Sequence, residues 1–136
     1  MNPIYDVVIL GCGEAGIFAA YELASHRPEL KVLALDQGRD IYHRSCPIVA
    51  GKVRECIHCP VCDAMCGFGG AGAFSDGKFN FTTQFGGWLT DFMEPRQVME
   101  LIDYVDSINV AHGATEQVFS TETAEAKALA RRALGL

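Results

Sequence analysis

The stretch "IYDVVILGCGEAGIFAAYELASHRPELKVLALD", residues 4–36, decides the fold. It opens with an apolar run, residues 4–10, which is typical of a strand buried on both faces of a parallel sheet. After a glycine turn, apolar residues recur at helical spacing until Pro28, which cannot continue a helix. Residues 31–35, "KVLAL", read as a second buried strand. Strand, turn, helix and strand predict an α/β fold class, with a βαβ unit over residues 4–36 and parallel strands.

The turn itself carries the pattern G-x-G-x-x-G, formed by Gly11, Gly13 and Gly16. The first glycine permits the tight turn, the second lets the backbone approach a pyrophosphate, and the third lets the helix pack closely on the strand. The helix that begins here directs unpaired N–H groups and its positive dipole end toward such phosphates. The pattern therefore predicts dinucleotide binding. Glu14 and Ala15 belong to this turn, and no chemistry is assigned to the Glu14 side chain.

An acid stands where a dinucleotide-binding fold requires one. Asp36 comes at the end of the second expected strand, roughly 20 residues after the glycine turn. A carboxylate at this place can accept hydrogen bonds from both hydroxyls of an adenosine ribose, and it disfavours a 2′-phosphate. The alternative is a plain βαβ turn with no ligand, but strand, turn, helix, strand and acid all follow in register.

Further motifs connect this unit to a known family. They are "LALDQGRD" at residues 33–40, the Cys46–Pro47 pair, "FGGAGAFSDGKFNF" at residues 68–81 and "FGGWL" at residues 85–89. With the cysteine spacing described below, the chain resembles FAD-dependent dehydrogenases of little assigned function, which are flavoproteins with two dinucleotide-binding domains. The resemblance covers residues 4 to about 105 and implies a Rossmann-like fold that holds FAD across a parallel sheet.

The resemblance also implies roles for individual residues. Gly11, Gly13 and Gly16 would contact the pyrophosphate of FAD, and Asp36, followed by Gly38, would hold the adenosine ribose. A second glycine segment would pass near the pyrophosphate and the flavin; its residues are Gly69, Gly70, Ala71, Gly72 and Ser75. FAD is the expected cofactor, with NAD(P) as the alternative, because the turn and the acid alone do not separate the two.

The implied activity is that of an oxidoreductase whose flavin takes a hydride or electrons from a small-molecule substrate or electron donor. The motifs reveal neither the substrate nor a catalytic residue. Members of the family are several times longer than this chain, so we expect the N-terminal portion of a flavoprotein with an incomplete fold. We treat residues 1–136 as one FAD/NAD(P)-binding domain fragment, and we do not expect activity from it alone.

Residues 37–90 form a long excursion rich in cysteine and glycine, and such excursions are usually functional. Within it, Cys56, Cys59, Cys62 and Cys66 follow the C-x₂-C-x₂-C-x₃-C spacing of bacterial ferredoxins. In those proteins a remote Cys-Pro completes each cluster, and Cys46–Pro47 supplies such a pair here. A [4Fe–4S] cluster held by Cys46, Cys56, Cys59 and Cys62, with Cys66 spare, is one interpretation. Against it, Gly67 stands where proline usually follows the fourth cysteine.

Two other interpretations of the cysteines stay open. Zinc sites normally use two separate C-x-x-C pairs, whereas the pairs here share residues, and His58 is poorly placed to replace a thiolate. The third interpretation has no metal and treats the loop as small, soft side chains with one redox-active pair. The alternative function is accordingly a non-catalytic fragment or a small iron–sulfur or zinc module.

Composition limits the remaining classes of function. The chain has 136 residues, 49% of them hydrophobic and 21% charged, with a net charge of −6. These values are typical of a globular protein, and the negative charge argues against nucleic-acid or membrane-surface partners. No basic leader precedes the first apolar run, and that run is too short to span a bilayer. We therefore expect a cytoplasmic protein.

Residues 94–136 are expected to be mainly helical. Pro95 suits the first position of a helix whose apolar stripe is Val98, Leu101, Ile102 and Val105. A short strand around residues 117–120, "QVFS", is expected next. An alanine-rich helix then follows, capped by Ser120 or Thr121, with Arg131 and Arg132 near its negative end and Gly135 just past it.

Overall fold

The computed structural model describes residues 4–84, 86–120 and 123–135. Phe85 of the FGGWL motif and the expected helix cap Thr121 lie outside the described residues. The chain divides into two compact units, of which one ends at Lys78 and the other begins at Phe79. Each unit is described by itself.

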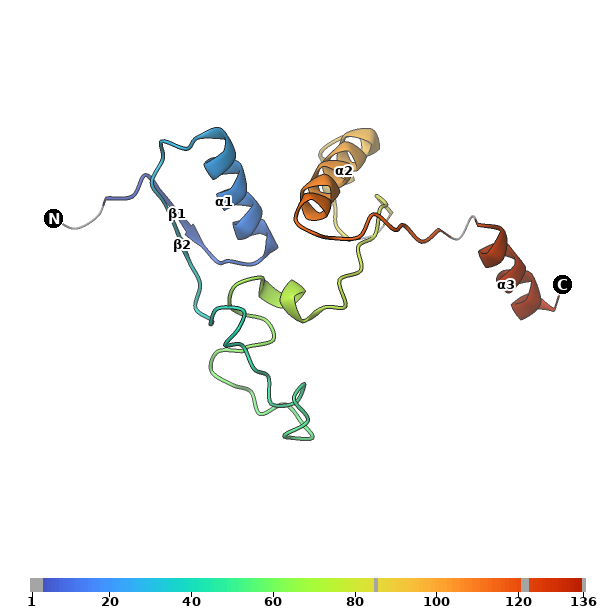
Figure 1. The fold of residues 1–136 in the computed structure, drawn as a ribbon, viewed down its shortest axis with the longest axis horizontal. Coiled ribbons are helices and arrows are strands. Elements are labelled where there is room, and N and C mark those ends of the chain that lie inside the picture. The colour runs from blue at the N-terminus through green and yellow to red at the C-terminus, as the bar shows by residue number, and fades with distance from the viewer. Residues whose placement is uncertain (1–3, 85, 121–122, 136) are drawn as a thin grey trace. The chain divides into compact units, whose positions relative to one another are not determined.

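The first unit is built on a βαβ arrangement, in the order β1 (Val7–Leu10), α1 (Glu14–His26) and β2 (Val32–Leu35). The two strands are parallel, and their register pairs Val7 with Val32 and Leu10 with Leu35. Helix α1 packs against both strands, as Figure 1 shows in blue. The helix ends before Pro28, at the place where proline removes a backbone donor. The α/β fold class predicted from the sequence is confirmed.

The two strands are not buried on both faces, which corrects the expectation from their apolar sequence. Along β1, half-buried Val7 and Ile9 alternate with exposed Val8 and Leu10, and Leu10 is 81% exposed. In β2, Leu35 is 47% exposed. The physical reason is that, among the described residues of the first unit, α1 alone covers the sheet, so one set of alternating side chains has no cover. The described part of this sheet thus presents an open apolar face.

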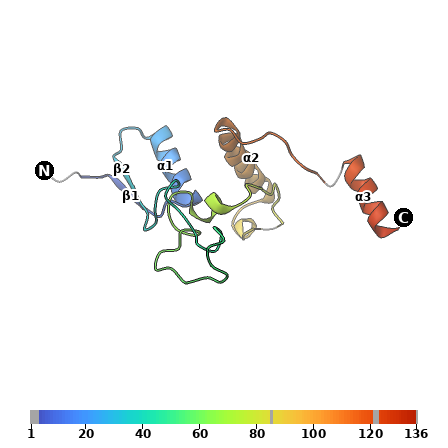
Figure 2. The same ribbon diagram turned by 60° about the horizontal axis from the view of Figure 1, so that its bottom comes forward.

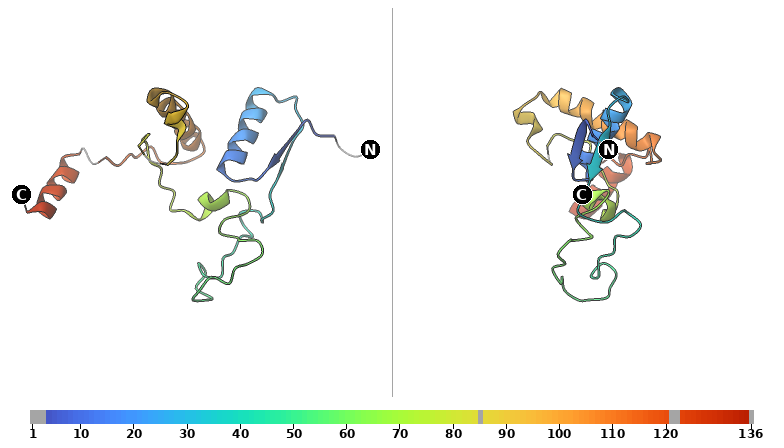
Figure 3. Two further views of the ribbon diagram at one scale, coloured as in Figure 1. Left: turned by 180° about the vertical axis from the view of Figure 1, so that it is seen from behind. Right: turned by 90° about the vertical axis from the view of Figure 1, so that its left-hand side faces the viewer.

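Residues 37–69 form a loop without helix or strand, which then leads into η1, a short 3₁₀ helix over Gly70–Phe74. The two ends of the loop meet, because the N–H of Phe68 donates to the carbonyl of Arg39 at 3.1 Å. At the same place a side chain on Gly38 would collide with the backbone, since its Cβ would lie 2.4 Å from the nitrogen of Gly67. Figures 2 and 3 show the body of the loop extending away from β1, β2 and α1.

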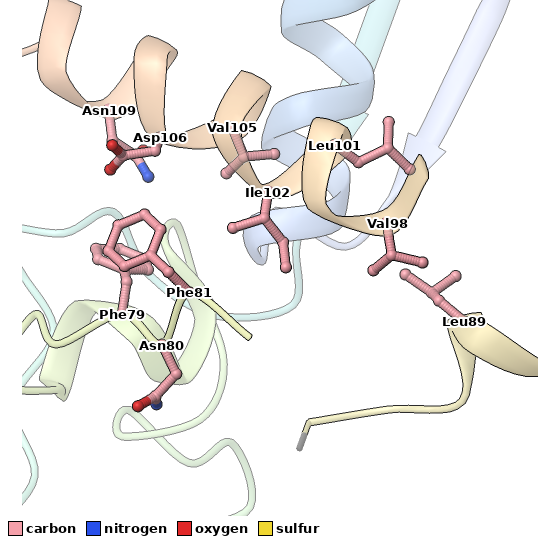
Figure 4. Close-up of a pocket in the computed structure, with 10 residues that line it drawn as sticks. All are labelled: Phe79, Asn80, Phe81, Leu89, Val98, Leu101, Ile102, Val105, Asp106 and Asn109. Carbon is pink, nitrogen blue, oxygen red and sulfur yellow. The ribbon is translucent and has the colours of Figure 1, made fainter. Parts of the chain in front are cut away.

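The second unit centres on α2 (Pro95–Ala111), preceded by η2, a short 3₁₀ helix over Leu89–Asp91. Pro95 occupies the start of the helix as expected, and the side chain of Gln97 accepts a hydrogen bond from the N–H of Glu94 at 3.0 Å. The predicted apolar stripe faces a pocket of about 260 Å³ (Figure 4). The apolar residues around it are Phe79, Phe81, Leu89, Val98, Leu101, Ile102 and Val105. The stripe therefore forms the local apolar cluster of this unit.

The last helix, α3 (Ala124–Leu134), starts later than expected. Its cap is Thr123, whose hydroxyl accepts a hydrogen bond from the N–H of Ala126 at 3.2 Å, so the assignment of the cap to Ser120 is wrong. Gly135 ends the helix in the left-handed conformation with φ 70°, as its position predicted.

The strand expected at residues 117–120 is absent from the described structure, which has no partner strand beside it. Among the described helices, none is long and apolar enough to cross a membrane.

Candidate functional site

The glycine turn between β1 and α1 favours glycine at its two ends for different reasons, the backbone conformation at Gly11 and lack of space at Gly16. Gly11 adopts φ 103°, a left-handed conformation that favours glycine, and its N–H donates to the carbonyl of Leu35 at 2.7 Å. A Cβ on Gly16 would lie 1.9 Å from the carbonyl oxygen of Gly11 and 3.4 Å from the side chain of Ile9. The turn thus fixes helix α1 close against β1.

Helix α1 presents free donors at its N-terminus. Gly13 is the N-cap and supplies no side-chain hydrogen bond, and the first bond of the helix runs from Ile17 to the carbonyl of Gly13. None of the described residues accepts a hydrogen bond from the backbone N–H groups of Glu14, Ala15 or Gly16. The positive end of the helix dipole and these unpaired donors together favour an anionic group at this place.

The second glycine segment touches the first. The N–H of Gly69 donates to the carbonyl of Cys12 at 2.8 Å, inside the G-x-G-x-x-G turn. A Cβ on Gly70 would lie only 3.0 Å from the Cα of Gly13. The two backbones pass this closely because Gly70 carries no side chain, whereas a Cβ on Gly13 would meet the Cα of Gly70 at an ordinary contact distance of 3.9 Å. The structure therefore brings together two glycine segments that lie far apart in the sequence.

The other residues of the second glycine segment differ in their surroundings. Gly72 lies against the side chain of Glu14, since a Cβ there would be 2.5 Å from the Glu14 Oε1 atom. Ala71 is exposed in the middle of η1. The hydroxyl of Ser75 accepts a hydrogen bond from the N–H of Gly77 at 3.1 Å, which closes a local turn. Ser75 is thus engaged within its own segment and not with the first glycine turn.

Asp36 connects the whole arrangement through its carboxylate. Its Oδ2 atom accepts a hydrogen bond from the N–H of Cys12 at 2.7 Å, and its Oδ1 atom accepts from Gly38 at 2.8 Å and from Gly67 at 2.6 Å. The N–H of Cys12, followed by that of Gly38, lowers the pKa of Asp36 below its ordinary value of 3.8, although burial acts in the opposite direction. Gly67 and the charge of Arg44 lower this pKa further. Asp36 is therefore an ionised anchor for three segments of backbone.

The hydrogen bonds from the backbone reduce the number of acceptor positions on the Asp36 carboxylate that a ligand could use. A carboxylate oxygen can accept two hydrogen bonds, and Oδ2 accepts only one within the described structure. One acceptor position on the side of the glycine turn therefore remains for a donor group. Reasoning from sequence assigned Asp36 to the ribose alone and missed its bonds to backbone, because a loop contact across 31 residues leaves no local pattern.

Arg44 is the residue that sequence reasoning missed. It is 8% exposed, and its guanidinium donates from Nε to the carbonyl of Asp63 and from Nη1 to the carbonyl of Phe68, both at 2.8 Å. The guanidinium carbon also lies 4.8 Å from the ring centre of Phe74. Its buried Nη2 has no hydrogen-bond partner among the described residues. The available signal was that Arg39, Arg44, Lys52 and Arg54 make this segment locally basic, but it did not single out Arg44.

The cysteines fall into three different surroundings. Cys12 is buried within the first glycine turn. The side-chain amide of Gln37 donates to the sulfur of Cys66 at 3.1 Å, at the base of the loop. The remaining four, Cys46, Cys56, Cys59 and Cys62, line one pocket of about 220 Å³. As they stand, no three cysteine, histidine or acidic side chains of the described residues are grouped so as to hold a metal ion.

Comparison with known proteins finds short local similarity. The chain is 51% identical to a thiamine thiazole synthase from Coprinopsis cinerea over 37 residues, which are 27% of this chain and 12% of that protein. It is 54% identical to the thiamine thiazole synthase of Phaeosphaeria nodorum over 33 residues, or 24% of this chain and 10% of that protein. The matched segment thus spans about a tenth of the length of these curated relatives.

The comparisons go no further than this. No family model matches the chain, and no solved structure matches it. The two partial matches do not support the particular dehydrogenase family that the motifs resemble.

Proposed function

We propose that this chain binds the ADP part of FAD at the junction of its two glycine segments. The observation that carries the proposal is the contact between them, made by Gly69 on Cys12 and by Gly70 on Gly13 at the N-terminus of α1. A pyrophosphate needs backbone N–H groups without side chains in the way, and this junction offers them.

The residues present fit the adenosine end of the cofactor. The N–H groups of Glu14, Ala15 and Gly16 are free to donate to phosphate oxygens. The remaining acceptor position on the Asp36 Oδ2 atom suits one ribose hydroxyl, and the same negative charge disfavours a 2′-phosphate. A dinucleotide without that phosphate is therefore the expected ligand, and NADP is not.

The corresponding activity is that of the FAD-binding N-terminal portion of a flavin-dependent oxidoreductase. When bound, FAD would accept a hydride or electrons from a small-molecule donor. The residues described here bind and orient the cofactor, and none is assigned to the chemistry of the donor. The open apolar face left by Val8 and Leu10 agrees with a sheet that would need further cover in the active protein.

The proposal is tested by titrating the chain with FAD while following flavin fluorescence, with FMN and NAD titrated in parallel. FMN carries the flavin without ADP, whereas NAD carries ADP without the flavin. We expect FAD to bind, ADP to compete with it, and FMN to bind much more weakly. The proposal fails if the folded chain binds none of them, or if FMN binds as tightly as FAD. If NAD binds more tightly than FAD, the ligand of the site is a nicotinamide cofactor and not a flavin.

A further inference from the structure

The base of the cysteine loop holds two distant cysteines close to each other. The N–H of Ser45 donates to the Oδ2 atom of Asp63 at 3.0 Å, and Arg44 donates to the carbonyl of the same residue at 2.8 Å. Ser45 directly precedes Cys46, and Cys62 directly precedes Asp63. These hydrogen bonds therefore fix the two arms of the loop where Cys46 and Cys62 both line the 220 Å³ pocket.

The other two thiols of the pocket lie on the tip of the loop, where the described backbone makes few hydrogen bonds. Cys56 and Cys59 both line the pocket, on either side of His58. His58 adopts φ 51°, the left-handed conformation, which turns the chain sharply between them. From residue 53 to residue 61, no backbone N–H donates to another described backbone group. The tip can thus close on a ligand without breaking a backbone hydrogen bond.

Cys66 differs from these four in every respect that matters for a ligand. Its sulfur accepts a hydrogen bond from Gln37, and its N–H donates to the carbonyl of Cys62 at 2.8 Å. Its backbone is in contact with Gly38, where a Cβ would lie 2.5 Å from the carbonyl carbon of Cys66. It does not line the pocket. The fourth cysteine of the sequence motif is therefore held at the base of the loop, outside the pocket that the other three line.

We propose that Cys46, Cys56, Cys59 and Cys62 bind a [4Fe–4S] cluster, and that Cys66 lies outside the ligand set. Three closely spaced cysteines and one remote Cys-Pro are a known way to hold one cubane cluster, whereas zinc normally uses two separate pairs. Each thiol loses its proton as its sulfur bonds to iron, so binding releases protons and closes the tip of the loop. The segment around the cysteines also carries four bases, Arg39, Arg44, Lys52 and Arg54, whose charge is opposite to that of the thiolates.

The cluster would form by closure of the tip of the loop on its two fixed arms. Hydrogen bonds hold the arms that carry Cys46 and Cys62 at the pocket, and the tip supplies the sulfurs of Cys56 and Cys59. Preformed metal sites are rare, and the binding of the metal commonly completes the fold around it. This site is independent of the glycine junction, so it goes beyond the FAD-binding proposal.

The test is anaerobic reconstitution of the whole chain with equal amounts of ferrous and ferric iron and with sulfide, followed by iron and sulfide analysis and visible absorbance. We expect about four iron and four sulfide per chain, with thiolate-to-iron charge-transfer absorbance. Cys46→Ala should lose this cluster, whereas the matched variant Cys66→Ala should retain the wild-type iron content. Circular dichroism of both variants checks that the βαβ unit remains folded.

Each other outcome overturns the proposal. If the wild-type chain takes up no iron and sulfide, the loop is not an iron–sulfur site. If Cys66→Ala loses the cluster and Cys46→Ala keeps it, the ligand set is the sequence motif itself. If zinc added alone binds at one ion per chain and prevents cluster formation, the site is a zinc site. FAD binding measured in the same variants should be unchanged, so failure of one proposal does not imply failure of the other.

Discussion

The carboxylate of Asp36 accepts a 2.6 Å hydrogen bond from the backbone N–H of Gly67, across 31 residues of sequence. The same carboxylate holds the N–H of Cys12 in the first glycine turn. One side chain therefore fixes the end of β2, the first glycine turn and the base of the cysteine loop in one place. An acid usually considered only as a ligand for ribose also assembles the site here.

Replacing Asp36 by asparagine should make the first unit less stable and remove part of its acid sensitivity. The pKa of Asp36 is lowered in the folded chain, so its contribution to stability is complete above its ordinary pKa of 3.8 and is lost as the pH falls through the lower folded value. An asparagine side chain cannot accept hydrogen bonds with both ends, because its amide nitrogen is a donor. Hydrogen exchange at the amide of Gly67, measured as a function of pH, shows whether the hydrogen bond to Asp36 protects this amide and at which pH the protection is lost.

The control is Asp40→Asn, because Asp40 is an exposed acid beside His43 that anchors no distant backbone. This variant should leave exchange at Gly67 unchanged. Equal protection of Gly67 in wild type and in Asp36→Asn would contradict the role given to Asp36.

Gly70→Ala should weaken FAD binding more than it weakens the fold. The new Cβ would lie 3.0 Å from the Cα of Gly13, so the two glycine segments would have to separate. Overpacking of this kind costs about 1–3 kcal/mol, or roughly a 5- to 150-fold loss of affinity if it falls on the bound state. Flavin fluorescence titration measures it.

Gly77→Ala is the matched control for Gly70→Ala. Gly77 has a similar left-handed backbone, with φ 72° against 54° for Gly70, but a Cβ on it would meet nothing within 4 Å. It therefore carries the conformational strain without the collision. If both variants lose affinity equally, strain and not the junction of the two segments explains the effect.

Gly16→Ala and Gly13→Ala should separate stability from binding. A Cβ on Gly16 would lie 1.9 Å from the carbonyl oxygen of Gly11, so helix α1 would have to move away from β1, at a cost of about 1–3 kcal/mol or more. A Cβ on Gly13 would approach only the Cα of Gly70, at 3.9 Å, and should leave the fold intact while obstructing a pyrophosphate. Urea unfolding and FAD titration of both variants test this. A Gly13→Ala chain that binds FAD normally would place the pyrophosphate elsewhere.

Arg44→Lys should loosen the cysteine loop although the positive charge is kept. A lysine cannot donate in two fixed directions to the carbonyls of Asp63 and Phe68, and it loses the planar contact with Phe74. We expect a loss of about 1–3 kcal/mol of local stability, visible as faster proteolysis within residues 45–63. Arg39→Lys is the control, since Arg39 is exposed and lies 3.7 Å from Asp63. Equal proteolysis of the two variants would show that Arg44 does not hold the loop.

The elements with a strong local pattern could be predicted from the sequence. Periodic apolar residues and Pro28 determine β1, α1 and β2, and Pro95 marks the start of α2. The burial of the strands could not be predicted. An apolar strand sequence indicates that both faces are suited to burial, but it does not show whether the described chain supplies helices to cover both faces. The cap at Thr123 was missed because three neighbouring residues, Ser120, Thr121 and Thr123, are all chemically suited to it.

In the candidate site, too, local features could be predicted from the sequence and long-range contacts could not. The turn residues were identified because glycine spacing is a local signal. The bonds from Asp36 to Gly67 and from Arg44 to Phe68 depend on how a long loop returns on itself, which no short window of sequence contains. The contact of Gly70 with Gly13 is of the same kind.

Because Gly38 and Gly67 cross closely, the cysteine loop begins and ends at nearly the same point. Both ends of the insert leave and re-enter the βαβ unit at one point, held by Asp36 and by the Phe68–Arg39 hydrogen bond. Doubling the length of such a loop costs only about 0.6 kcal/mol of closure entropy. The length of this loop can therefore change at little cost in closure entropy while the glycine junction beneath it stays the same.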